Sequence, residues 1–168
     1  MNPILKFCAS LLISIHCALA FGAEGDAVIY VPELRCHDGL YRVSLPETVE
    51  ALRKIGTLRE ERLVETLVWG DKSESHILEL KFDALTLSIM SDGQKRRYSL
   101  AKATITDPRW VLAPNFRVGD SVAVVLKRLG RKDTALGTVL VFGGDTDFVS
   151  FKNVDGKISE IEIACYTG

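Results

Sequence analysis

The stretch Phe116–Gly130, FRVGDSVAVVLKRLG, decides the expected fold, because it carries every signal of one short amphipathic helix. Either Asp120 or Ser121 is suited to cap the first turn of this helix. Its apolar residues recur at a spacing that places them on one helical face: Val122, Val125, Leu126 and Leu129. Two basic residues suit the dipole of the last turn and a glycine predicts the stop: Lys127, Arg128 and Gly130.

A second stretch, Tyr41–Gly56 (YRVSLPETVEALRKIG), repeats this plan. Ser44 and Glu47 fit a capping box, in which the two side chains bond the first free N–H groups of a helix. The predicted apolar face consists of Thr48, Ala51, Leu52 and Ile55. Counted back from the terminal glycines, the two faces match at a constant offset of 74 residues. This offset predicts an internal repeat. The alternative is that any capped helix before a hairpin looks alike.

Segments with β-branched or alternating sequences follow each predicted helix. Those after the first helix are Glu65–Trp69, His76–Phe82 and Leu85–Met90, and those after the second are Thr138–Phe142, Phe148–Phe151 and Lys157–Tyr166. The segments Arg97–Leu100 and Ala103–Thr106 predict a short strand pair or one broken strand, and Ala27–Val31 predicts a strand before the first helix. Leu58–Arg62 (LREER) is charged and predicts a solvated turn or a helix extension.

The order helix, strand, strand, strand therefore occurs twice, over about 41–100 and 116–168. We expect an α+β fold in which two tandem helix-then-antiparallel-hairpin repeats form one sheet, with the helices packed on one face. The 168 residues, 26% charged and 47% hydrophobic, fit one globular domain. The net charge of −1 argues against recognition of nucleic acid or of an anionic membrane by overall charge.

The first 20 residues predict a secretory signal peptide. Lys6 supplies a positive start, Phe7–Ile15 is a short apolar run, and Ala18-Leu19-Ala20 offers the small-x-small cleavage pattern. We expect cleavage after Ala20, or alternatively after Ala23, which leaves residues 21–168 as a single exported domain, periplasmic or secreted. Because the apolar run is too short for a permanent transmembrane helix, we expect no integral membrane segment after cleavage. A membrane anchor is the competing hypothesis.

The cysteines predict one disulfide. Cys8 and Cys17 leave with the signal peptide, and the exported chain keeps Cys36 and Cys165. Two cysteines in an oxidising compartment most simply bond to each other. Closing a loop of about 130 residues stabilises a fold by up to roughly 4–5 kcal/mol in the loop-entropy description. The alternatives are two free thiols or a redox pair, although a redox pair usually has Cys-x-x-Cys spacing.

Residues of the second copy resemble a known family. Its motif positions are similar to the SmpA/OmlA type of small envelope protein, over Arg117–Ser121, Val125-Leu126, Leu129-Gly130 and Asp155–Ile158. That family shares a fold with the secreted β-lactamase-inhibitor protein, in which two such repeats place helices on one face of a sheet. The chain departs from the family by lacking a lipobox and by being doubled, and from the inhibitor by keeping two cysteines after export. The resemblance implies a fold and a tendency to bind proteins.

The sequence carries no motif of a familiar catalytic or metal site. No Cys/His spacing matches a zinc site, and neither a phosphate loop nor a G-x-S-x-G turn is present. The neighbours Cys36 and His37 suggest a thiol nucleophile, but on an extended segment we expect them to point to opposite sides, and a disulfide would use the sulfur. His76 is typical of a strand surface. Gly143–Asp147 (GGDTD) predicts a hairpin turn, with calcium binding as the alternative. We therefore expect no catalytic residue, no metal and no cofactor.

Two features are suited to binding. Gln94–Arg97 (QKRR) is a compact basic turn that is either solvated or meets an acidic partner through Lys95, Arg96 and Arg97. Trp69 and Trp110 would be binding anchors if exposed. We expect an exported, non-enzymatic protein that binds or inhibits another protein, of unknown identity, through its sheet face. The alternatives are a small periplasmic hydrolase whose site the sequence does not reveal, and a structural envelope component.

Overall fold

A computed structural model describes residues 28–32, 34–36, 42–94, 96–131 and 138–167. The predicted signal peptide and both candidate cleavage sites lie outside these residues, as do His37 and Lys95. Within the described part of the chain, no helix is long and apolar enough to cross a membrane.

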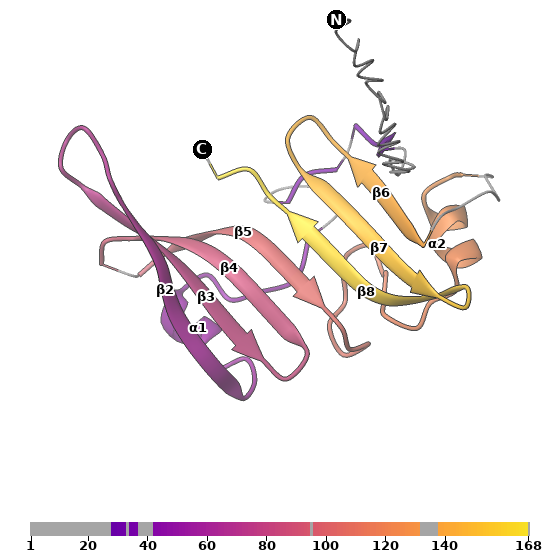
Figure 1. Ribbon diagram of the computed structural model, residues 1–168, viewed down its shortest axis with the longest axis horizontal. Helices are drawn as coiled ribbons and strands as arrows, with labels where there is room; N and C mark the ends of the chain where they lie inside the picture. Colours follow the sequence, from indigo (N-terminus) through magenta and orange to yellow (C-terminus); the bar gives the residue numbers. More distant parts are fainter. Residues whose placement is uncertain (1–27, 33, 37–41, 95, 132–137, 168) are drawn as a thin grey trace, which may run out of the picture.

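The fold is one eight-stranded sheet in the order β1-β6-β7-β8-β5-β4-β3-β2 (Figure 1). The first half of the chain supplies four strands, β2 (Leu58–Val68), β3 (Glu74–Phe82), β4 (Leu85–Asp92) and β5 (Tyr98–Ile105). The second half supplies β6 (Val139–Gly143), β7 (Phe148–Val154) and β8 (Lys157–Ala164). The short β1 (Val28–Tyr30) runs parallel to β6, and the remaining neighbours pair antiparallel.

Alternation along the strands gives the sheet one buried face and one open face. The register carries a fully buried row across four strands, formed by Leu80, Leu87, Ala103 and Ile163. An adjacent residue in each of these strands points to the other face, and these residues form a second row: Lys81, Thr86, Thr104 and Glu162. We call this second face the open face, since in Figure 1 it is turned to the reader, with helix α1 (Val49–Leu52) behind β2 and β3.

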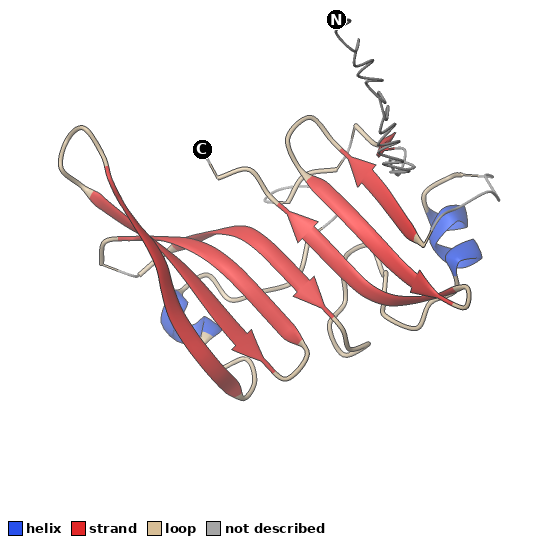
Figure 2. Cartoon of the chain, in the orientation of Figure 1, coloured by secondary structure: helices blue, strands red, loops and turns tan. Residues whose placement is uncertain are grey.

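The expected α+β arrangement, with helices packed on one face of the sheet, is wrong. The described residues hold two helices, α1 of four residues and α2 (Val122–Arg128) of seven, so the fold is mostly β (Figure 2). Irregular connections supply much of the core layer opposite the sheet, with buried apolar residues at Leu34, Val43, Leu112 and Phe116. The two predicted helical faces supply only part of this core layer, through Leu52 in α1 and Val125 and Leu126 in α2.

The first helix is shorter than expected, because its N-cap is Thr48 and not Ser44. The Thr48 hydroxyl oxygen accepts the N–H of Ala51 at 3.2 Å. The backbone before it is held by a tertiary contact, in which the Tyr98 hydroxyl donates to the Pro46 carbonyl. A capping box needs helical backbone directly after its serine, and this contact keeps the chain outside the helix.

The second helix is confirmed. Ser121 is its N-cap, and the hydroxyl oxygen accepts the N–H of Val124 at 3.3 Å. Lys127 and Arg128 occupy the last turn. Gly130 follows with φ +67°, a left-handed conformation that glycine adopts without steric cost.

The predicted turn over Leu58–Arg62 is wrong, since these residues form the first half of β2. Their charges are tolerated because each meets an opposite charge on a neighbouring segment. Arg59 lies 2.6 Å from Asp83, and Arg62 lies 3.1 Å from Glu79. Charge alone is therefore compatible with an edge strand, which is solvated on one side.

The internal repeat stays a prediction. The strand order is symmetric about the central β5–β8 pair, and each helix N-cap forms an antiparallel bridge near the start of a central strand, Thr48 with Arg97 and Ser121 with Lys157. The two N-caps are 73 residues apart, one fewer than the sequence offset. Four strands follow α1 and three follow α2, with β1 taking the other edge of the sheet.

The predicted disulfide is confirmed. The sulfur atoms of Cys36 and Cys165 are 2.10 Å apart, and the bond closes a sequence separation of 129 residues. It joins the segment after β1 to the residue that follows β8.

Candidate binding face

Ion pairs between neighbouring strands cover the β2–β3 part of the open face. Lys81 Nζ lies 3.0 Å from Glu60 and 3.4 Å from Glu79, and Arg62 contacts the same Glu79 carboxylate. The hydrogen bond from Arg62 holds the pKa of Glu79 below its usual value, and the bond to Glu60 raises the pKa of Lys81. Because these charges neutralise one another, this part of the face does not favour a partner of either sign.

At the opposite end of the sheet, four apolar or aromatic side chains are exposed together. Val28 and Tyr30 of β1, Phe148 of β7 and Tyr166 after β8 are 55%, 55%, 42% and 60% exposed. Val28, Tyr30 and Phe148 lie on the open face, because Gly143 pairs with both Tyr30 and Phe148. We call these four residues the aromatic end.

Gly143 makes room for the aromatic end. A β-carbon at this position would lie 2.9 Å from Cε1 of Phe148 and 2.9 Å from Cγ1 of Val28. Carbon atoms in proteins pack no closer than about 3.5 Å, so a larger residue would push these side chains apart. The glycine thus lets Phe148 and Val28 approach each other across the strand between them.

Two aspartates of the β6–β7 turn hold the aromatic end in place. The Asp145 carboxylate accepts the hydroxyl of Tyr30 at 2.7 Å. Asp147 is 6% exposed, and its two oxygens accept the N–H of Cys36 at 2.7 Å and that of Tyr166 at 2.8 Å. One buried carboxylate therefore ties the start of β7 to the backbone on both sides of the disulfide.

The same turn was the candidate calcium loop of the sequence. Within the described residues, no group of three histidine, cysteine, aspartate or glutamate side chains is placed to hold a metal ion. Both oxygens of Asp147 are already used by backbone N–H groups. Both acids of the turn, Asp145 and Asp147, are therefore accounted for by hydrogen bonds within the fold.

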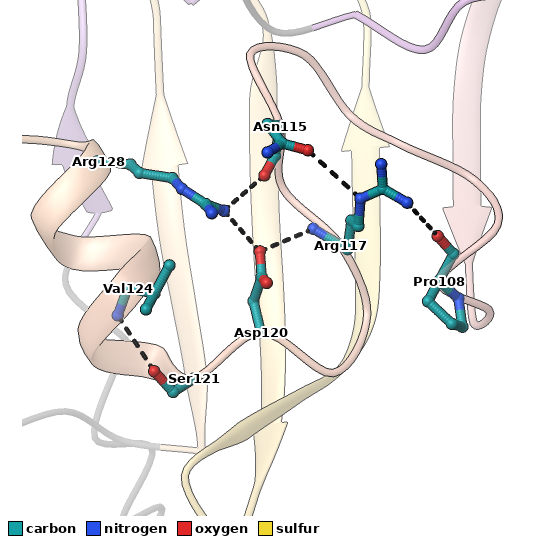
Figure 3. A network of polar contacts seen from close by, with 7 residues as sticks. All are labelled: Pro108, Asn115, Arg117, Asp120, Ser121, Val124 and Arg128. Carbon is teal, nitrogen blue, oxygen red and sulfur yellow. Dashed lines mark hydrogen bonds and ion pairs between the residues drawn. The ribbon is translucent and has the colours of Figure 1, made fainter.

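On the buried side of the sheet, a polar network fixes the connection before α2 (Figure 3). Asp120 accepts the N–H of Arg117 at 3.1 Å and the guanidinium of Arg128 at 2.7 Å. Arg128 also donates to the carbonyl of Asn115, and its guanidinium lies 5.9 Å from the centre of the Phe116 ring. Asp120, one of the two candidate caps, therefore anchors this loop while Ser121 caps the helix.

The two tryptophans lie apart from the aromatic end. Trp69 follows β2 at the β2–β3 hairpin, is 47% exposed, and donates its indole N–H to Ser75 at 3.0 Å. Trp110 is partly buried against the core. It forms one wall of a shallow hollow of about 290 Å³, lined also by Ile55, Gly56, Thr57, Phe82, Asp83 and Arg109.

The basic turn also lies elsewhere. Arg96 and Arg97 are exposed between β4 and β5. Asp92 accepts the N–H of Arg96, whose carbonyl accepts the N–H of Val49 at the start of α1. The backbone of this turn therefore has a structural part, while its guanidinium groups face solvent. The structure brings none of the described predicted binding residues to the aromatic end.

For the alternative that the chain is a hydrolase, the described residues show no cluster of candidate catalytic side chains around His76. His76 Nδ1 contacts the Thr66 hydroxyl at 3.2 Å, and His76 forms no ion pair with a described carboxylate. A second hollow, of about 430 Å³, is wide open and lined by Arg42, Ser44, Val111, Ala113, Pro114 and Asn115. Neither hollow contains a histidine.

Sequence reasoning missed Tyr30 and Phe148 as surface residues. The alternation of β7 held a signal, because Val149 and Phe151 are buried and Phe148 must then point to the other face. The exposure of Tyr30 had no such signal, since it depends on β1 lying at the edge of the sheet beside β6.

No family model, curated protein or solved structure matches this chain. The resemblance to the SmpA/OmlA type of envelope protein therefore stays a prediction, and the candidate site is argued from the geometry of the sheet.

Proposed function

We propose that this chain is an exported, non-enzymatic binding protein that engages another protein through the open face, with the aromatic end at the centre of the contact. The observation that carries the proposal is the exposure of Val28, Tyr30 and Phe148 on a sheet face that no described helix covers, with Tyr166 exposed shortly after β8. Soluble proteins seldom leave large apolar side chains grouped on a surface unless that surface meets a partner.

The composition of the aromatic end favours a protein partner. Tyrosine and phenylalanine are enriched in the centres of protein interfaces, where they bury much area at a low cost in conformational entropy. The described hollows lie elsewhere, one beside Trp110 and the other beside Pro114. Exposed aromatic side chains outside a pocket are suited to contact with a protein surface, whereas a small molecule needs an enclosing pocket.

The anchoring of the aromatic end supports the same proposal. Tyr30 is held by Asp145, and the backbone of Tyr166 by Asp147. The disulfide between Cys36 and Cys165 restrains the adjoining segments. A surface that is ordered before binding loses less conformational entropy when the partner arrives, so more of its contact energy becomes affinity.

Export is part of the proposal. The predicted signal peptide directs the chain to an oxidising compartment, and the disulfide is compatible with that destination. Fractionation of cells that produce the full chain, with the mass of the purified product, tests this step. A product that starts at Phe21 or Glu24 and lies outside the cytoplasm supports export. An uncleaved cytoplasmic product refutes it.

Site-specific photocrosslinking tests the binding face. A benzophenone side chain replaces Phe148 in one sample and Ser88, in the polar middle of the same face, in a control. We expect a crosslinked protein from envelope extract with the first sample, at least about tenfold weaker with the second. Added unlabelled protein should compete, whereas its Val28→Asp variant should not. Equal adducts at both positions, or none at Phe148 in repeated trials, would overturn the proposal.

A further inference from the structure

The strand β2 forms one edge of the sheet. It has 11 residues and pairs with β3 alone in the strand order. The unpaired side of an edge strand presents a row of solvated backbone N–H and C=O groups that can pair with another extended segment.

The first half of this edge is protected by charge. Arg59, Glu60, Glu61 and Arg62 each form an ion pair with a residue outside β2, at 2.6, 3.0, 2.7 and 3.1 Å. A register shift between Leu58 and Glu60 also bends the strand there. Charged side chains and bulges are the usual means by which proteins keep other strands away from an edge.

The second half carries much less charge, with Glu65 as its one ionisable side chain, and has one register shift, between Leu63 and Glu65. Leu63, Val64 and Val68 of β2 and the adjoining Trp69 are 52%, 49%, 68% and 47% exposed. We call these four residues the β2 apolar edge. They are arranged symmetrically about Thr66: valines lie two positions to either side, and Leu63 and Trp69 lie three positions to either side.

We propose that two copies of this chain associate through their β2 edges, antiparallel and centred on Thr66. A twofold axis at Thr66 places Val64 of each copy opposite Val68 of the other, and Leu63 opposite Trp69. The two Thr66 side chains meet on the axis, a cross-strand pair that is favourable in antiparallel sheets. A twofold contact needs a surface complementary to itself, and this symmetry provides one.

The backbone of the hairpin supports this register. Trp69 donates its N–H to the Ser73 carbonyl at 2.9 Å and accepts from Lys72 at 2.8 Å, so the polar groups of Trp69 face β3. Hydrogen bonding alternates along an antiparallel strand, which directs the N–H and C=O groups of Thr66 and Val68 to the free edge. On the N-terminal side of Thr66, the register shift between Leu63 and Glu65 interrupts the regular pairing of β2 with β3.

The contact is short, so the dimer is weak and forms reversibly as concentration rises. It joins two sheets at their β2 edges and leaves the aromatic end of each copy at the far side of the sheet. The proposal does not depend on the function of the aromatic end. Sedimentation tests the dimer and photocrosslinking at Phe148 tests the aromatic end, so each proposal can fail without the other.

Sedimentation of the purified protein between about 1 and about 500 µM tests the association, with the Val68→Lys variant beside it. We expect a monomer at the low end, dimer at the high end, and a dissociation constant raised at least about tenfold by Val68→Lys. Val154→Lys is the matched control, because Val154 is a valine of 56% exposure at the end of β7. It should leave the dissociation constant unchanged.

Crosslinking tests the register and does not depend on how Val68→Lys folds. A cysteine at Thr66 lies on the proposed axis and should form an intermolecular disulfide on mild oxidation, while a cysteine at Val154 should not. Circular dichroism verifies that each variant is folded. A protein that is monomeric throughout overturns the proposal. So does a dimer that persists in Val68→Lys and in which the Thr66 cysteine stays reduced.

Discussion

The carboxylate of Asp147 accepts the backbone N–H of Cys36 at 2.7 Å, although 111 residues separate them in the chain. Its other oxygen accepts the N–H of Tyr166, directly after Cys165. The disulfide and the carboxylate therefore stabilise the same junction, where the segment after β1 meets the start of β7 and the end of β8. The position of the aromatic end depends on this junction.

Replacing Asp147 by alanine should lower the free energy of unfolding by about 3 kcal/mol, because the buried N–H of Cys36 and the partly buried N–H of Tyr166 lose a charged acceptor. Chemical denaturation monitored by circular dichroism measures the change. Asp145→Ala is the matched control, since Asp145 is exposed and accepts one hydroxyl, and its cost should be about 1 kcal/mol or less. Equal losses in both variants would contradict the role given to Asp147.

The disulfide should protect Cys36 and Cys165 from alkylation until it is reduced. Mass spectrometry after treatment with iodoacetamide should show no adduct without reductant and two adducts with it, at Cys36 and Cys165. Changing both cysteines to serine should cost about 2–5 kcal/mol in the free energy of unfolding. Alkylation of both thiols without reductant would contradict the bond.

Two phenylalanines of the second half should differ sharply on truncation. Phe116 is fully buried, with its ring centre 5.3 Å from that of Phe151 in an edge-on arrangement, so Phe116→Ala should cost about 3–5 kcal/mol. Phe148 is 42% exposed, and Phe148→Ala should cost about 1 kcal/mol or less. Thermal and urea unfolding measure both values. A Phe148 cost as large as that of Phe116 would assign Phe148 to the core.

Stability should fall at high pH through Tyr98. Burial raises the pKa of its hydroxyl from the ordinary value of 10.0 to about 12. In the unfolded chain the phenol ionises first, so the free energy of unfolding falls as pH rises from about 10 to about 12. Absorbance at the phenolate band follows the titration, and Tyr98→Phe should flatten this part of the stability curve. The partial exposure of Tyr98 keeps the effect modest. A Tyr98→Phe variant with the same pH dependence would refute the assignment.

Predictions from local sequence were confirmed where the structure depends on residues that are close together in the chain. The Ser121 cap, the apolar face of α2 and its glycine stop all lie within one short segment, and α2 formed as expected. The predicted hairpin turn at Gly143–Asp147 also formed, between the antiparallel strands β6 and β7. Ser44 failed as a cap because a contact from Tyr98, far along the chain, holds the backbone at Pro46 outside the helix.

The sequence by itself determined the strands with strict alternation, the turns between them, the second helix and the pairing of two remaining cysteines. Each follows from residue type and near spacing. The tertiary structure decided the fold class, because α1 keeps only four residues and irregular connections supply much of the core layer that the helices were expected to form. It also decided which side chains form the aromatic end. Tyr30 and Phe148 lie on either side of Gly143 because β1 pairs parallel with β6, and no local pattern in the sequence encodes that partner.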